Sequence, residues 1–181
     1  MDPHAHPPGP TPSEPPSEEA MLEAVYALLF ERARELMQDQ PAGHTLQATA
    51  LVNEVYLKLV GRPDSYWTDS GHLLLTAARA MRQVLVDHAR RKGATKRGGE
   101  FQRHPLDGVV VAYEERSDDL EALDRALEEL AEFSPEMARV VELRFFAGQS
   151  MREIAGILGI SPRTLDRKWD ATRAWLESAL R

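Results

Sequence analysis

The residues of this chain that could perform chemistry are few and widely spaced. Asp87 and His88 form a carboxylate–imidazole pair such as metal hydrolases use, but both are expected on one helix, where no further ligand follows at a suitable spacing. His4 and His6 also stand without other ligands, and no glycine-rich phosphate loop occurs. The chain has no cysteine, which excludes disulfides, thiolate zinc sites and a cysteine nucleophile. We therefore expect no catalytic residue, no metal and no cofactor.

The distribution of charge indicates a nucleic-acid partner instead. The net charge is −7, but residues 79–103 hold eight bases and two acids, a net of +6, and residues 143–181 hold seven bases and four acids, a net of +3. Acidic segments precede and separate these two basic ones. Because charge interactions are screened over about 10 Å at moderate salt, each basic segment can attract phosphates while the whole chain stays acidic. The alternative is that both are ordinary solvated helix faces.

Hydrophobic residues recur at helical spacing, and no segment shows a convincing strand pattern, so the sequence predicts an all-α fold. The first two helices are expected to bury Leu28 and Val60 among others. The third is expected to end at Lys92, because Gly93 follows it. The predicted helices lie between Ser17 and Pro41, Thr45 and Gly61, His72 and Lys92, Leu120 and Leu130, Ser134 and Gly148, Ser150 and Gly159, and Ser161 and about Leu176.

The segment from Ser150 to Trp169 predicts a helix-turn-helix. Ser150 and Glu153 have the spacing of a capping box, and Gly159 can supply the positive φ of a tight turn. Ser161 and Pro162 then start a second helix. Its exposed, partly basic N-terminal side suits the major groove of DNA, where arginine can contact guanine. A helical hairpin that binds protein is the alternative.

A second cationic surface is predicted on the third helix. Arg79, Arg82, Gln83 and Arg90 lie opposite its apolar stripe, and an aromatic loop containing Tyr66 and Trp67 precedes it. Stacking surfaces beside a cationic groove suit bases taken out of a duplex. Taken alone, Trp67 is also readily explained as a core residue.

Four segments together resemble the extracytoplasmic-function group of bacterial sigma factors, over about residues 20–181. Residues 50–60, ALVNEVYLKLV, resemble the helix that binds the clamp helices of the RNA polymerase β′ subunit. Residues 82–92, RQVLVDHARRK, resemble the helix that reads the minus-ten promoter element. Residues 138–146, ARVVELRFF, and the helix-turn-helix resemble the module that reads the minus-thirty-five element.

The resemblance implies two small helical domains, region 2 at 20–100 and region 4 at 120–181, joined by a flexible linker at 101–119. A proline-rich tail, 1–19, is expected to be disordered because it has almost no large apolar residues. The implied function is that of a sigma factor, which brings polymerase to promoters, assists DNA opening and is not an enzyme. The implied partners are polymerase core (β′ clamp helices and β flap), promoter DNA and, as an open question, an anti-sigma factor.

The resemblance also assigns roles to individual residues. The implied polymerase-binding residues are Asn53, Glu54, Leu57 and Lys58. The implied minus-ten residues are Tyr66, Trp67, Arg79, Arg82, Gln83, Arg90 and Arg91. The implied minus-thirty-five residues are Ser161, Arg163, Thr164, Arg167 and Lys168.

Two residues depart from the pattern of the family. Ala50 stands where an acidic residue is usual, which affects the polymerase contact, and Gln83 replaces a usual Asn, which affects promoter preference. Two other functions remain open: a DNA-binding regulator that acts without polymerase, and an adaptor whose basic faces bind acidic proteins. The sequence shows neither a long uncharged run nor a secretory signal, so we expect no membrane insertion and a cytoplasmic location.

Overall fold

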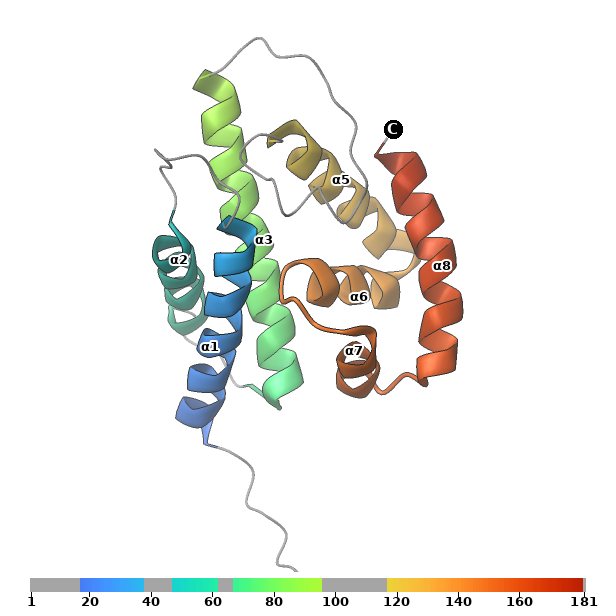
Figure 1. Ribbon diagram of the computed structural model, residues 1–181, viewed down its shortest axis with the longest axis horizontal. Helices are drawn as coiled ribbons and strands as arrows, with labels where there is room; N and C mark the ends of the chain where they lie inside the picture. Colours follow the sequence, from blue (N-terminus) through green and yellow to red (C-terminus); the bar gives the residue numbers. More distant parts are fainter. Residues whose placement is uncertain (1–16, 38–46, 62–66, 96–116, 181) are drawn as a thin grey trace, which may run out of the picture.

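The computed structural model describes residues 17–37, 47–61, 67–95 and 117–180, which form seven α-helices and no strand (Figure 1). The predicted tail up to residue 16, the segment 96–116 with most of the predicted linker, and Tyr66 lie outside these residues. The all-α prediction is confirmed. The helices are α1 (Glu18–Met37), α2 (Ala48–Val60), α3 (Ser70–Thr95), α5 (Ser117–Phe133), α6 (Pro135–Phe145), α7 (Met151–Leu158) and α8 (Pro162–Ala179).

Helices α1, α2 and α3 form the N-terminal bundle. Each carries apolar residues three or four positions apart, so that one face of each helix can be buried. Leu29, Val55 and Leu85 are almost completely buried, and each comes from a different helix of the bundle. The bundle therefore has a core to which all three helices contribute.

Helices α5 to α8 form the C-terminal module. Leu127 of α5 and Leu143 of α6 are buried, as are Ile154 of α7 and Leu165 of α8. Phe146, just after α6, is one of the largest fully buried side chains. Helices α5, α6 and α7 all pack against the inner face of α8 and leave its outer face exposed.

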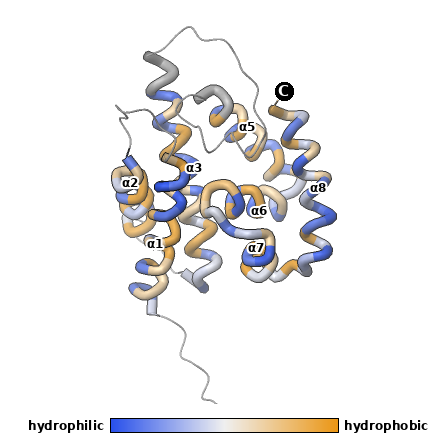
Figure 2. The backbone as a smooth tube through the Cα atoms, in the orientation of Figure 1, coloured by the Kyte–Doolittle hydropathy of each residue, from blue (hydrophilic) through white to orange (hydrophobic). Residues whose placement is uncertain are grey.

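The two modules pack against each other through α3. This helix contacts α1 and α2 on one side and α5 and α6 on the other, and Figure 1 shows it running between the two groups. The buried apolar residues of both modules belong to one connected cluster. Figure 2 shows the corresponding mixture of hydrophobic and hydrophilic positions along α3. The sequence analysis did not predict this contact between modules.

Three sequence predictions about the helices are wrong in detail. Leu28 and Val60 were expected to face inward but are 46% and 43% exposed, because each lies just outside the buried stripe of its helix. Helix α3 continues past Gly93 to Thr95. A single glycine costs a helix only about 1 kcal/mol relative to alanine, which the surrounding helix can absorb. None of the described helices has the length and apolar character needed to cross a membrane.

Candidate nucleic-acid interface

Helix α7 begins with the predicted capping box. The Ser150 hydroxyl accepts the Glu153 amide at 3.3 Å, and the Glu153 carboxylate accepts the Ser150 amide at 2.8 Å. The same carboxylate accepts the Ser150 hydroxyl at 2.6 Å. Hydrogen bonds to the side chain and backbone of Ser150 hold the pKa of Glu153 below its ordinary value of 4.5. The carboxylate is therefore ionised at neutral pH, where it suits the positive end of the helix dipole.

The turn from α7 to α8 has the geometry that its sequence predicts. Gly159 has a φ of 64°, the left-handed conformation that glycine adopts without strain. The amide of Ile160 donates to the carbonyl of Ala155 at 3.0 Å, which closes the end of α7. The Ser161 hydroxyl then accepts the Thr164 amide at 3.2 Å and caps α8. The direction in which α8 leaves the module is thus fixed by local bonds.

The first two turns of α8 carry the predicted DNA-contacting residues. Arg163 and Arg167 are exposed, whereas Leu165 between them is buried and anchors the helix. Lys168 is also exposed and forms an ion pair with Glu136 of α6. Thr164 is partly buried, and its hydroxyl accepts that of Ser161 at 2.8 Å. The helix presents cationic side chains on its outer face, next to an N-terminus whose dipole also attracts phosphate.

The predicted cationic face of α3 lies against the C-terminal module. Arg79, Arg82, Gln83 and Arg90 line a crevice of ≈ 200 Å³ together with Asp124 of α5. Arg79 Nε lies 2.8 Å from Glu142 Oε2 of α6, and Arg90 Nη2 lies 3.0 Å from Asp124 Oδ2. Arg79 and Arg90, which the sequence assigned to DNA, are therefore paired with carboxylates of this same chain.

Arg82 lies between these two carboxylates. Its Nε is 3.5 Å from Asp124 Oδ1 and its Nη1 is 3.7 Å from Glu142 Oε1. Both acids are buried, with side chains only 9% and 6% exposed. A buried carboxylate needs a charged partner, and the arginines of α3 supply it.

Two other predicted minus-ten residues, Trp67 and Arg91, do not line this crevice. Trp67 is partly buried against the core, and its ring meets that of His72 edge-on at 5.9 Å. Arg91 is exposed, and its Nε donates to the carbonyl of Asp87 one turn earlier at 3.1 Å. A core position for Trp67 was the alternative stated from sequence, and its partial burial agrees with that alternative in part.

Comparison with known protein families gives one result. The model of the family described as ECF sigma factor matches residues 14–181. The chain belongs to the ECF sigma factor family. The general role of an RNA polymerase sigma factor follows, with polymerase and promoter DNA as partners, and the family is not a class of enzymes. No curated protein and no solved structure matched the chain.

Helix α2 of this sigma factor carries the predicted polymerase-binding residues. Asn53, Glu54, Leu57 and Lys58 are all exposed, and Leu57 is 66% exposed. Asn53 Oδ1 accepts the hydroxyl of Tyr26 at 3.3 Å. Tyr56 and Val60 of the same helix are also exposed, so α2 carries several large apolar side chains at its surface rather than a single one.

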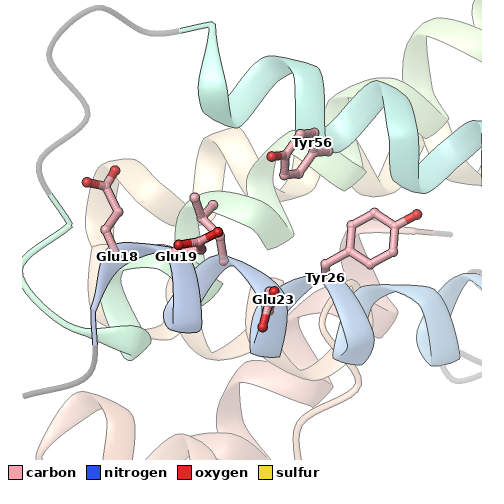
Figure 3. Close-up of a pocket in the computed structure, with 6 residues that line it drawn as sticks. Glu18, Glu19, Glu23, Tyr26 and Tyr56 are labelled. Atoms are coloured by element: carbon pink, nitrogen blue, oxygen red, sulfur yellow. The ribbon is translucent and has the colours of Figure 1, made fainter.

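A groove of ≈ 620 Å³ adjoins this surface. Figure 3 shows Tyr26 of α1 and Tyr56 of α2 on its two sides, with Glu18, Glu19 and Glu23 along α1. The two tyrosine rings meet edge-on with centroids 6.0 Å apart. The groove combines aromatic and acidic groups, and sequence reasoning did not single it out.

Sequence reasoning also missed the two buried acids, Asp124 and Glu142. The signal was present, because Asp124 lies four residues after Leu120 and three before Leu127, within the apolar stripe of its helix. Glu142 likewise stands between the buried Val141 and Leu143. An acidic residue in an apolar stripe indicates a cationic partner. No group of three or more potential metal ligands occurs among the described residues.

Proposed function

We propose that this sigma factor directs core polymerase to a specific set of promoters and assists the opening of the DNA. Region 2, residues 20–100, is assigned to polymerase and the minus-ten element, and region 4, residues 120–181, to the minus-thirty-five element. The predicted linker 101–119, whose last three residues belong to α5, connects them. The observation that carries the proposal is the firmly capped α8, which presents Arg163 and Arg167 on a helix-turn-helix within a matching family.

The minus-thirty-five element is read by the N-terminal part of α8. Arg163 and Arg167 extend from successive turns of its outer face, where guanidinium groups can bond base edges in the major groove. Ser161, Thr164 and Lys168 complete this surface and position it on the phosphates. Capping and the buried Leu165 keep the helix rigid, so that the two arginines approach the bases together.

The minus-ten element is read by α3 and the loop before it. Arg79, Arg82, Gln83, Arg90 and Arg91 supply a cationic face, while Trp67 and Tyr66 supply stacking surfaces. The side chains of Arg79 and Arg90, each about half exposed, support this assignment.

Polymerase core binds the exposed face of α2. Asn53, Glu54, Leu57 and Lys58 contact the clamp helices of β′, and region 4 contacts the β flap. The support is the exposed Leu57, flanked by the partly exposed Tyr56 and Val60. Because polymerase and chromosome share the cytoplasm, the factor works there, and an anti-sigma factor covering the same face would silence it.

Run-off transcription with purified core polymerase on a library of genomic fragments tests the proposed function. Addition of the factor should produce transcripts with new, defined start sites. Leu57→Ser should weaken binding to core about tenfold, the effect of losing about 1.4 kcal/mol of apolar contact, while leaving thermal unfolding unchanged.

Leu28→Ser is the matched control, because it removes another exposed leucine from a neighbouring helix. It should leave the affinity for core near that of the unmodified factor. Failure of the unmodified factor to bind core or to change start sites would contradict the proposal.

A further inference from the structure

The contact between the modules engages three arginines of the surface that the proposed function assigns to the minus-ten element. Arg79, Arg82 and Arg90 each bond a carboxylate of the C-terminal module, with separations of 2.8 to 3.7 Å. Asp124 and Glu142 are acceptors with the charge of DNA phosphate groups, placed one on each side of Arg82. The carboxylates of region 4 therefore bind the arginines of α3 where the phosphates of a nucleic-acid strand would bind them.

Contacts away from the arginines hold the same arrangement. Arg32 of α1 donates from Nε and Nη2 to the carbonyl of Phe145, at 3.1 and 2.8 Å, and its side chain is only 15% exposed. At the other end of the contact, a Cβ built on Gly71 of α3 would lie 2.9 Å from a methyl group of Ile157 of α7. The modules thus touch at three separate places along α3 and α1.

The two DNA surfaces differ in this arrangement. Arg163 and Arg167 of α8 stay exposed, while Arg82 of α3 is only 20% exposed. The packing of the modules therefore buries the central arginine of the α3 surface and pairs its two neighbours, Arg79 and Arg90, whose side chains stay about half exposed, with carboxylates.

This arrangement is too small to span a promoter. The two elements are named for positions about 25 base pairs apart, or about 85 Å of B-DNA at about 3.4 Å per base pair. A folded chain of this length has a radius of gyration of about 16 Å, hence a diameter of about 40 Å. Reaching both elements at once requires the modules to separate.

We propose that the free sigma factor holds itself closed, with Asp124 and Glu142 standing in for DNA phosphates on Arg79, Arg82 and Arg90. The inference rests on the proposed function, since it concerns the surface assigned to the minus-ten element. The partner of α3 in this closed form is the acidic pair on α5 and α6 of the same chain. Core polymerase shifts the molecule toward the open form only if it binds the open form more tightly than the closed form. On opening, both acids reach water and the arginines become available to DNA.

The closed form can be locked with one engineered bond. A Cβ on Gly71 lies 3.7 Å from the Cβ of Ile157, within the 3.5 to 4.5 Å that disulfides span. The chain contains no cysteine, so Gly71→Cys with Ile157→Cys introduces a single possible pair. Mild oxidation of the free protein should form this disulfide, seen as a mass lower by two hydrogens. Thiols that stay unpaired in the folded protein would overturn the closed form.

The locked protein is then assayed with core polymerase on fragments that the unmodified factor transcribes. Run-off product should fall about tenfold or more in the oxidised protein and return on reduction with dithiothreitol, because only the bond differs. Equal product from the oxidised and reduced forms would overturn the proposal. The single variants Gly71→Cys and Ile157→Cys, treated with the same oxidant, control for damage by oxidation.

A second variant tests the ion pairs without polymerase. Asp124→Asn with Glu142→Gln removes both surrogate charges, and the free protein should then bind a generic single-stranded DNA oligonucleotide about tenfold more tightly. Glu129→Gln with Glu132→Gln makes the same change in net charge at exposed positions of α5. An equal gain in both double variants would show a general charge effect and overturn the proposal.

The two arms separate this inference from the proposed function. If neither the unmodified nor the reduced protein redirects transcription, the sigma-factor assignment fails. In that case, disulfide formation in the double-cysteine variant and oligonucleotide binding by the Asp124→Asn, Glu142→Gln variant still test whether the free molecule is closed, because neither measurement uses polymerase.

Discussion

At the scale of single residues, the exposed arginines of α8 and those of α3 face different chemistry. Arg167 stands on an outer helix face, whereas Arg82 lies between two buried carboxylates. In the proposed function the first contacts bases, and in the proposed closed form the second exchanges an intramolecular acid for a phosphate. The same residue type therefore contributes to selectivity in one helix and to general affinity in the other.

Arg167→Ala should weaken binding to the cognate minus-thirty-five sequence by about 1–3 kcal/mol, the usual effect of losing a bidentate contact to a base, and should relax sequence preference. Competition binding of holoenzyme to cognate and scrambled duplexes measures both effects. Arg173→Ala is the control, because Arg173 lies later in α8 and pairs with Glu177 at 3.0 Å. A similar loss of preference in the two variants would argue against base contact by Arg167.

At the scale of elements, the helix-turn-helix depends on backbone conformation as much as on packing. Gly156 and Gly159 lie three residues apart, and a Cβ at either would meet no atom within 4 Å. They differ in conformation, since Gly156 is inside α7 and Gly159 has a positive φ. A methyl group has room at both positions, so the two glycines differ only in backbone conformation.

Alanine substitution should therefore act in opposite directions at these two glycines. Gly156→Ala should raise the free energy of unfolding by about 0.5–1 kcal/mol, because alanine favours the helix and restricts the unfolded chain. Gly159→Ala should lower it by about 1–2 kcal/mol, because alanine is strained in the left-handed region. Urea denaturation of the two variants measures the difference, and effects of the same sign would contradict the explanation.

At the scale of the whole molecule, α3 belongs to two packing surfaces at once. It completes the N-terminal bundle and supplies the face on which α5 and α6 rest. Arg32 of α1 adds to the contact between the modules, because it donates two hydrogen bonds to the carbonyl at the end of α6. The stability of the two modules is therefore coupled.

Arg32→Met should lower the free energy of unfolding by about 1–3 kcal/mol, because it removes two donors from a largely buried carbonyl. Arg34→Met should change it by less than about 0.5 kcal/mol, because Arg34 is 63% exposed and its ion pair with nearby Glu31 lies at the surface. Chemical denaturation followed by circular dichroism compares them. Equal changes in the free energy of unfolding for the two variants would show that the hydrogen bonds to Phe145 do not stabilise the fold.

Much of the fold follows from local sequence signals. The capping box, the turn glycine and the cap at Ser161 were all predicted, because each depends on residues within one or two turns. The contact between modules was not, since it joins residues such as Arg79 and Glu142 that are 63 positions apart. Periodicity shows that a helix has an apolar face but does not identify the partner, and α3 has two such partners.

The same limit applies to the candidate site. Residue types and spacing assigned the arginines of α3 to DNA, whereas the structure pairs Arg79 and Arg90 with carboxylates of this same chain. Tyr66 lies outside the described residues, so its predicted role stays a prediction. Local signals predicted where α8 begins and how it is capped, whereas the surroundings of α3 depended on long-range packing.

The outward position of α8 has a consequence for the order of events on the chromosome. Its arginines are exposed before any rearrangement, so on the proposed roles of the two surfaces the free protein samples intact duplex through this helix alone. Strand separation must wait until the second surface is released. A factor organised in this way can visit many sites without disturbing base pairs at any of them, and melting is confined to places where the transcribing enzyme has already arrived.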